Sequence, residues 1–338
     1  MPAASERRPL DARVVVRAPA TSANLGPGFD ALGLALSLHD VVEAAATFTA
    51  ASTGGGAAPG SRDGVRRHAE QGAASGARAL ELSVDVEGVG AEVVPRDEKH
   101  LVVRAMRACF DELGVVPTRL ELTCRNVLPH GRGLGSSSAA IVAGVVAARA
   151  LAGADVTGQT ALADALALAG RIEGHPDNVA PCLLGGFTIA WTHQDGEARA
   201  ARLDPHPAIA PVLCVPSTEL ATATARGLLP DSVPHADAAR TAGRAALLVE
   251  AVTRRPDLLF EATEDRLHQA YREPAMPESV ALMSALRRRG LAAVVSGAGP
   301  SILVLSSGDE ASVVREVASG WDVRELAVDT AGAVVSGR

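Results

Sequence analysis

The chain has 338 residues, of which 47% are hydrophobic and 2% aromatic, and its formal net charge is −7. This length accommodates two domains, and the net negative charge together with the few aromatic side chains argues against a general nucleic-acid-binding protein. There is no apolar run of about 18 residues that would predict a membrane span, and the first ten residues lack the apolar core of a signal peptide. Four cysteines without CxxC spacing indicate buried thiols in a reducing compartment: Cys109, Cys124, Cys182 and Cys214. We therefore expect a cytoplasmic protein.

The first half of the chain contains predicted strands, an insertion and a long helix. Alternating apolar residues predict strands at residues 13–18, 41–50, 80–86 and 119–124. Residues 19–30 form a turn-rich segment that contains two glycines, two prolines and one asparagine. Residues 52–76 are rich in Gly, Ala and Arg, which predicts a disordered surface insertion. Apolar residues at helical spacing predict a helix at residues 99–113.

The second half mixes helices and strands. Helices are predicted at residues 139–151, 160–169, 277–289 and 309–318, with a helical hairpin at 236–267. Strands are predicted at residues 186–191, 211–215 and 323–328, with one more on each side of 296–300. The polar region 194–207 is a plausible domain boundary. Because strands and helices do not alternate regularly, an α+β fold is favoured over a doubly wound sheet.

The most informative motif spans residues 129–140, with the sequence Pro-His-Gly-Arg-Gly-Leu-Gly-Ser-Ser-Ser-Ala-Ala. Its glycines let backbone N–H groups approach an anion, and the helix that follows directs its positive end to the same place. Its serine hydroxyls can bind phosphate or a magnesium ion. The motif differs from a P-loop, because Ser136 stands where that motif has lysine. It predicts a phosphate cradle, with a flexible Gly/Ser connection as the alternative.

Other polar groups gather in three short segments. Asn24 and Asp30 flank a turn, where local turn chemistry is the alternative explanation. Residues 173–178 bring two carboxylates, an imidazole and an amide together, which can hold magnesium and orient a hydroxyl, or can simply end a helix. Residues 296–300 form a second glycine-rich loop, either a ligand contact or a tight hairpin turn. These segments are candidates for one binding site.

In this order along the chain, the motifs at 19–30, 129–140 and 296–301 resemble those of the GHMP small-molecule kinases (galactose, homoserine, mevalonate and phosphomevalonate kinases). The first motif, together with residues 175–181 and the Gly185-Gly186 pair, is similar to the homoserine branch of that family. The resemblance implies a two-domain α+β GHMP kinase fold. Its N-terminal domain, residues 11–200, would resemble domain 2 of a small-subunit ribosomal protein, and its C-terminal domain, residues 205–335, would be ferredoxin-like.

The resemblance also implies a reaction, in which the γ-phosphoryl group of ATP, bound with Mg²⁺ between the domains, moves to the side-chain hydroxyl of L-homoserine in threonine biosynthesis. It further implies a homodimer without nucleic-acid or membrane partners. The residues that it assigns to ATP are Pro129, His130, Gly131, Arg132, Gly133, Leu134, Gly135, Ser136, Ser137, Ser138, Ala139, Gly297 and Gly299. Ser137 and Glu173 are the implied magnesium ligands.

The residues that the resemblance assigns to homoserine are Asn24, Asp30, His175, Asn178, Arg226 and Arg272. Asp30 suits the ammonium group of the substrate, and the forked guanidinium groups of Arg226 and Arg272 suit its carboxylate. Asn178, at the reacting hydroxyl, and Arg226 are the implied catalytic residues. We expect transfer without a dedicated protein base, with Asp177 as the outside candidate.

Two alternatives to this function stay open. One is another GHMP enzyme, such as a mevalonate-pathway kinase or decarboxylase. Against it, the two arginines and Asp30 favour an amino-acid substrate. The other is a non-catalytic ligand sensor, against which the intact loop at 129–140 argues.

Overall fold

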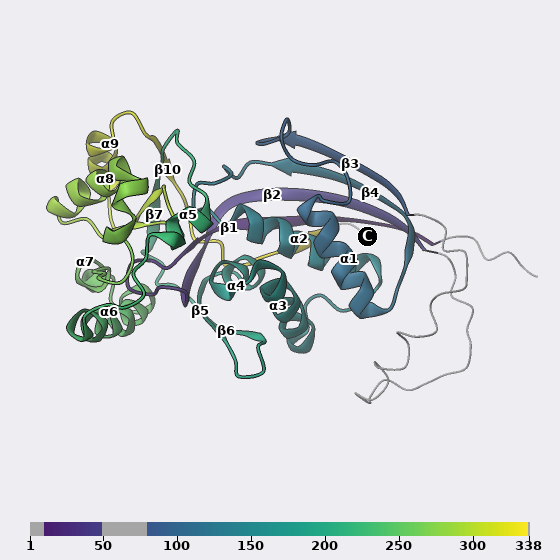
Figure 1. Ribbon diagram of the computed structural model, residues 1–338, viewed down its shortest axis with the longest axis horizontal. Helices are drawn as coiled ribbons and strands as arrows, with labels where there is room; N and C mark the ends of the chain where they lie inside the picture. The colour runs from purple at the N-terminus through teal and green to yellow at the C-terminus, as the bar shows by residue number, and fades with distance from the viewer. Residues whose placement is uncertain (1–9, 49–79, 337–338) are drawn as a thin grey trace, which may run out of the picture.

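A computed structural model of the chain describes residues 10–48 and 80–336. The predicted insertion at residues 52–76 lies outside these residues. Two sheets with their helices make up the fold, with the larger unit forming most of the molecule and the smaller one lying at one end (Figure 1). Mixed strands and helices in two such units confirm the predicted two-domain α+β fold.

The larger sheet has seven strands. They are β1 (Leu10–Ala23), β2 (Leu32–Phe48), β3 (Glu81–Gly88), β4 (Pro117–Asn126), β5 (Phe187–Thr192), β6 (Ala198–Leu203) and β11 (Val334–Ser336). The order is β11-β1-β2-β4-β3, and β5 pairs with both β2 and β6. β3 runs parallel to β4, and the other neighbours are antiparallel.

Four helices cover one face of this sheet (Figure 1). They are α1 (Leu101–Leu113), α2 (Ser136–Leu151), α3 (Gln159–Glu173) and α4 (Pro176–Leu184). α2 packs between the sheet and the neighbouring helices, so its small apolar side chains are buried around most of its circumference. The all-round apolar sequence of α2 is typical of such a central helix. Its N-terminus is thereby held in a fixed place, directly after the glycine-rich motif.

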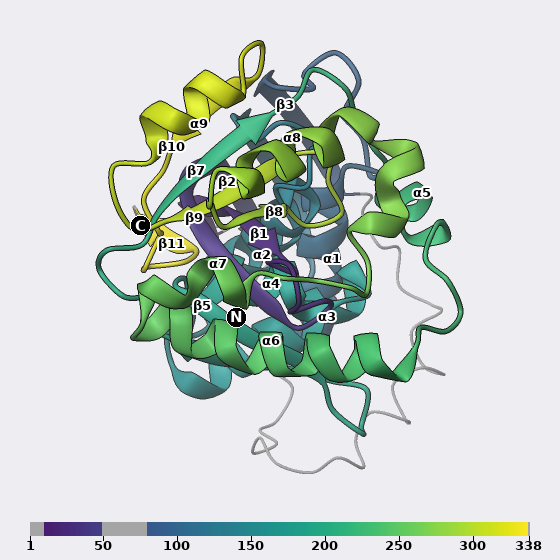
Figure 2. The same ribbon diagram turned by 90° about the vertical axis from the view of Figure 1, so that its left-hand side faces the viewer.

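The smaller sheet has the order β10-β7-β9-β8. Its strands are β7 (Ala210–Val215), β8 (Ala293–Val295), β9 (Ile302–Ser306) and β10 (Asp322–Glu325). Helices lie on both of its faces (Figure 2), namely α6 (His235–Thr253) and α7 (Leu259–Ala262) on one and α8 (Pro277–Arg288) and α9 (Ala311–Val317) on the other. Alternate residues serve the two cores, as β7 shows with Leu213 on the first face and Val212 on the second.

Several predicted boundaries were wrong. β1 continues to Ala23, through part of the predicted turn segment, and β2 begins at Leu32, well before the predicted strand. The polar region 194–207 contains a strand that was not predicted, β6, and the helical hairpin ends at Ala262 rather than at residue 267. α4 begins within the polar segment after Glu173, where no helix was predicted.

The end of the described chain returns to the larger sheet. β11 pairs with β1 through Val334–Ser336, so this strand lies with the first predicted domain rather than the second. The division near residues 200–205 remains a prediction. Among the described residues, no helix has the length and apolar character needed to cross a membrane.

Candidate functional site

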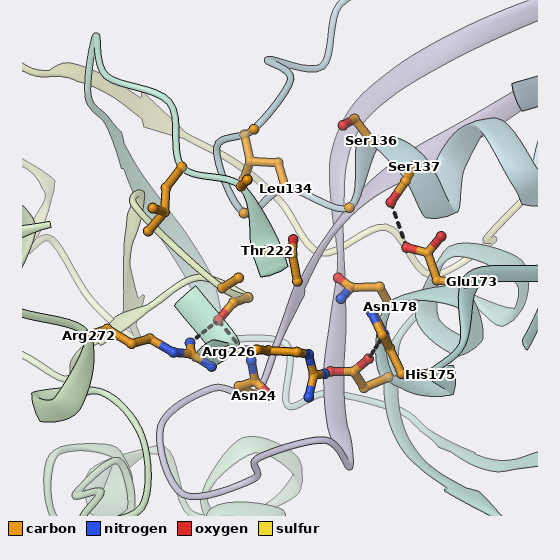
Figure 3. Close-up of a pocket in the computed structure, with 18 residues that line it drawn as sticks. Asn24, Leu134, Ser136, Ser137, Glu173, His175, Asn178, Thr222, Arg226 and Arg272 are labelled. Atoms are coloured by element: carbon orange, nitrogen blue, oxygen red, sulfur yellow. Dashed lines mark hydrogen bonds and ion pairs between the residues drawn. The ribbon is translucent and has the colours of Figure 1, made fainter. Parts of the chain in front are cut away.

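A pocket lies where the helical face of the larger unit meets the smaller sheet. Segments from across the chain line it: the end of β1, the loop before α2, the α3–α4 junction, α5 (Thr222–Gly227), the 3-10 helix Ala270–Ala275 and the β8–β9 loop. In Figure 3, Ser137 and Glu173 stand at one side of this pocket and Arg272 at the other, with Thr222 and Asn178 between them. The pocket therefore has two chemically different ends, which we call the loop end and the arginine end.

At the loop end, the backbone conformation requires glycine at two positions. Gly133 and Gly135 have φ values of 71° and 66°, in the left-handed region that L side chains rarely adopt. A Cβ atom at Gly135 would overlap the Thr21 hydroxyl, and one at Gly133 would overlap the carbonyl oxygen of Ser296. Gly135 is also the N-cap of α2, and no side chain caps this helix. The first N–H groups of α2 therefore remain available to an anion in the pocket.

Serine hydroxyls at the loop end face a carboxylate. Glu173, the last residue of α3, accepts hydrogen bonds from Ser137 Oγ at 2.6 Å and from Ser138 Oγ at 2.9 Å. The resemblance assigned Ser137 and Glu173 to magnesium, and the structure brings them together. Hydroxyl and carboxylate oxygens are ligands that suit Mg²⁺, which also keeps waters and substrate phosphates in its shell. No cluster of three or more His, Cys, Asp or Glu side chains suited to a metal occurs in the described part of the chain.

Arg272 defines the arginine end. It is 1% exposed, whereas arginine side chains usually lie at the surface of a protein. Its Nη1 donates to the carbonyl oxygen of Gly297 at 3.0 Å, whereas its Nε has no partner. Burial, and then the charge of Arg226, lower the pKa of Arg272 to about 10. A buried guanidinium with spare donors and no carboxylate on it is a ready site for an anion.

Arg226, at the arginine end, is paired with Asp30, which lines a neighbouring hollow together with Arg226 and His175 rather than the pocket itself. Two hydrogen bonds join them, from Arg226 Nη2 at 2.7 Å and Nη1 at 3.1 Å, and the Asp30 bond raises the pKa of Arg226. Both side chains are more than one-third exposed. The Phe29 ring contacts both arginines, because the guanidinium groups of Arg226 and Arg272 each lie 5.7 Å from its centroid. The predicted substrate residues are thus adjacent, with opposite charges side by side.

Asn178 and His175 lie between the two ends, on the first turn of α4 and at its N-cap. The Thr21 hydroxyl donates to Asn178 Oδ1 at 2.9 Å, which leaves the amide Nδ2 free to donate elsewhere. His175 Nδ1 lies 2.6 Å from the buried Asp177 carboxylate, and this hydrogen bond raises the pKa of His175. Asp177, the outside candidate for a base, is therefore occupied by the imidazole.

Asn24 connects two segments of the site through its side-chain amide. Its φ of 68° is unusual for a residue other than glycine, and its side chain is nearly fully buried. Asn24 Nδ2 donates to the Gly297 carbonyl at 2.8 Å, and its Oδ1 accepts from the Asp30 backbone N–H at 2.9 Å. The Gly297 carbonyl thus receives both Asn24 and Arg272, so this residue of the third motif connects the first motif to the arginine end.

Some residues of the predicted cradle have other surroundings. The pocket is lined by Gly131 and Gly133, whereas the side chain of Arg132 between them is directed to carbonyl oxygens of Pro216 and Ser217. Gly299, in the third motif, packs near the Met276 side chain, and Gly297 is the residue of that motif that lines the pocket. Arg132 and Gly299 are therefore structural parts of the loops rather than pocket-lining groups.

Sequence reasoning missed several residues of the site. Thr21 was not singled out because it lies in the predicted turn of the first motif, and nothing in the sequence around Thr222, at the start of α5, indicates a binding residue.

A second hollow adjoins the first through Ser136 and Ser137. It is lined by apolar and polar groups together: Asp40, Val42, Val94, His100, Leu101, Val102, Asn126, His130, Ala139 and Ala140. His100 is 3% exposed here, and its Nδ1 has no partner.

Comparisons with known proteins agree with this geometry. Residues 100–186 match the family model of the GHMP kinases N terminal domain, and residues 245–322 match that of the GHMP kinases C terminal. The homoserine kinase of Streptomyces coelicolor is 54% identical over 327 residues, with 96% of this chain and 94% of that protein covered.

Solved structures show the same relationship. A homoserine kinase from Cytophaga hutchinsonii has a TM-score of 0.77 at 26% identity, covering 96% of this chain and 97% of that one. A putative homoserine kinase from Listeria monocytogenes has a TM-score of 0.69 at 28% identity, covering 96% and 99%. The chain therefore has the two-domain GHMP kinase fold and belongs to the GHMP kinase family, within its homoserine kinase branch.

Proposed function

We propose that this protein transfers the γ-phosphoryl group of ATP to the side-chain hydroxyl of L-homoserine, giving O-phospho-L-homoserine for threonine biosynthesis. The observation that carries the proposal is the two-ended pocket. One end offers backbone N–H groups and a helix N-terminus to phosphate, and the other offers the buried, spare donors of Arg272 to a carboxylate. A phosphate-rich donor such as ATP matches the loop end, and an acceptor that is also an amino acid matches the arginine end.

The loop end would bind the triphosphate of ATP through the backbone around Gly133 and Gly135 and through the start of α2. Ser137 and Glu173 would hold the Mg²⁺ that accompanies ATP. When bound, this ion supplies positive charge that offsets the charge on the transferring phosphoryl group. The second hollow would receive the nucleoside, because its apolar lining and the buried His100 suit a heterocyclic base.

The arginine end would bind the amino-acid part of homoserine. The guanidinium of Arg272 would take the carboxylate, because a buried charge without a carboxylate partner is stabilised by one. Asp30 and Arg226 already pair with each other. The substrate ammonium group would take the place of Arg226 beside Asp30, and the substrate carboxylate would take the place of Asp30 beside Arg226. The side chain of homoserine would then extend toward Asn178.

The reaction itself would depend on position and charge more than on a protein base. Because Thr21 occupies Asn178 Oδ1, the amide N–H group is the part of Asn178 left to orient the acceptor hydroxyl. Asp177 is occupied by His175, which argues against it as the proton acceptor. The proton of the acceptor hydroxyl would pass to an oxygen of the transferred phosphoryl group or to water.

A coupled assay for ADP release tests this function. Purified protein with Mg-ATP should turn over L-homoserine, and phosphorus NMR should show a phosphate ester on the side-chain oxygen. Mevalonate, galactose and shikimate serve as the competing acceptors. Turnover of one of these with homoserine left untouched would refute the proposal.

We also propose that the enzyme is cytoplasmic and homodimeric. Its four cysteines are free and buried, which fits a reducing compartment. Burial raises the pKa of Cys109, Cys124 and Cys214 to about 12, so these thiols would be unreactive in the folded protein. Light scattering on the purified protein measures the oligomeric state directly.

A further inference from the structure

Arg132 lies in the middle of the glycine-rich loop but is directed away from the phosphate pocket. Its Nε donates to the Pro216 carbonyl at 3.1 Å, its Nη2 to the Ser217 carbonyl at 2.6 Å, and its Nη1 to the His130 carbonyl at 3.2 Å. The side chain is 13% exposed, so these carbonyl bonds replace most of its hydration. Its one acidic neighbour in the described residues, Glu219 at 3.3 Å, is 72% exposed and contributes little.

The segment that Arg132 holds leads directly to the arginine end. The Leu220 backbone N–H donates to the Gly131 carbonyl at 2.9 Å, so backbone and side chain attach the same two segments to each other. Leu220, Ala221 and Thr222 then line the pocket, and Thr222 begins α5. α5 carries Arg226, the partner of Asp30. A short, continuous stretch of chain thus joins the loop that receives phosphate to the side chains that receive the acceptor.

We propose that Arg132 is a positioning residue that couples the two ends of the pocket, so that nucleotide and acceptor each strengthen the binding of the other. This inference rests on the proposed function. The planar fork of arginine suits the role, because it reaches two consecutive carbonyls of one segment and one of its own loop. Lysine would keep the charge but could not make the same set of bonds. The coupling is reciprocal, because it is a single free energy shared by both ligands.

Calorimetry on the full-length protein measures this coupling. The affinity for Mg²⁺ and a non-hydrolysable methylene analogue of ATP is determined with and without saturating L-homoserine. In the parent, homoserine should tighten the analogue by roughly 5-fold or more, a typical size for coupling between sites. In Arg132→Lys and Arg132→Gln this factor should fall toward one, and kcat should fall with it.

The alternative is that Arg132 contacts phosphate directly. Arg132→Lys would then keep the parent coupling factor, and Arg132→Gln would weaken the analogue equally with and without homoserine. Either result overturns the proposal, as does a parent without coupling. A parent that binds the analogue but no homoserine contradicts the proposed function itself, and the coupling proposal falls with it.

Two further measurements separate positioning from general damage. Glu219→Gln removes the exposed ion pair but keeps the carbonyl bonds, so its coupling factor should equal that of the parent. Hydrogen exchange of the Leu220 amide should be faster in Arg132→Lys than in the parent, because its bond to Gly131 is held in place by the arginine. Unchanged Leu220 protection in Arg132→Lys, with thermal stability equal to the parent, would contradict the proposal even if turnover were lower.

Discussion

The loop end and the arginine end of the pocket are built in different ways. Apart from Glu173, the loop end is one continuous segment, in which positive-φ glycines lead into the N-terminus of α2 and the ligand-binding groups belong mostly to the backbone. The arginine end is assembled from side chains on distant segments: Asp30 and Arg226 are 196 residues apart in sequence, yet they form a bidentate pair. Ligand binding by backbone N–H groups depends on the free space around the loop, whereas ligand binding by side chains depends on how their charges are paired. Each end should therefore fail in its own way when it is altered.

The largest effect is expected for Gly135→Ala. The added Cβ would meet the Thr21 hydroxyl and would also sit at a φ of 66°, so the loop must move away from the phosphate position. We expect nucleotide affinity and kcat/KM to fall about 100-fold or more, as when positioned hydrogen-bond donors are lost from a reacting group. Gly153→Ala is the matched control, because it has a similar φ of 73° with open space around it. Equal nucleotide binding by both variants would contradict the cradle.

The next effect is expected for Arg272→Ala at the other end. Removing one partner of a buried charge pair costs about 2–5 kcal/mol, so the KM for homoserine should rise by roughly 30-fold or more. The KM for ATP should stay near that of the parent. Arg226→Ala should raise the KM for homoserine less, because this side chain is 37% exposed and already paired with Asp30. Steady-state kinetics with each substrate varied would show the order, and the reverse order would remove Arg272 as the main carboxylate site.

A smaller effect is expected for Glu173→Gln, which tests the metal side of the loop end. The variant keeps the shape of the side chain but loses the negative charge that faces Ser137. The Mg²⁺ concentration for half-maximal activity should rise about 10-fold, in line with the loss of one carboxylate ligand's support. Glu197→Gln, in the β5–β6 hairpin where Glu197 pairs with Arg171 of α3, should leave that concentration unchanged. Identical magnesium curves for Glu173→Gln and the parent would place the ion elsewhere.

The smallest effect is expected for Asp177→Asn, which alters the pKa of His175 between the two ends of the pocket. The hydrogen bond to Asp177 raises the pKa of His175 above its ordinary value of 6.5. This interaction stabilises the folded protein fully at pH values below 6.5, and the stabilisation is lost as pH rises through the raised pKa. Asp177→Asn should bring the His175 pKa, measured by NMR titration of the imidazole, down toward 6.5. An unchanged titration would mean that the pair does not control the protonation of His175.

The loop end could be proposed from sequence because its information is local. The glycines, the serines and the following helix are contiguous, and their physical roles can be derived from residue type alone. The structure places Gly133 and Gly135 where a side chain would collide, as a close backbone approach requires. The side chain of Arg132 is directed away from the pocket, and nothing in the loop sequence indicates that Pro216 and Ser217 lie beside it.

The arginine end was less accessible from sequence because burial and pairing are tertiary properties. A surface position is the usual expectation for an arginine, but Arg272 is enclosed by Phe29 and the Gly297 carbonyl. Some elements were missed for similar reasons. β6 is an edge strand with a mostly exposed face, so its composition is polar, and α4 contains Pro181 within a polar start. Thr21 and Ser22 are polar yet fully buried, and their hydroxyl groups hydrogen-bond to Asn178 and Ser296, far away in the sequence.

The most direct test of the account compares kcat/KM for L-homoserine with that for 3-aminopropan-1-ol, the same acceptor without its carboxylate, in the parent and in Arg272→Ala. If the arginine end selects an amino acid, the parent should prefer homoserine by on the order of 100-fold, the scale of a lost charged hydrogen bond. In Arg272→Ala that preference should largely disappear, because the carboxylate has lost its partner. A parent that phosphorylates both acceptors equally well, or a variant that keeps the full preference, would contradict the account.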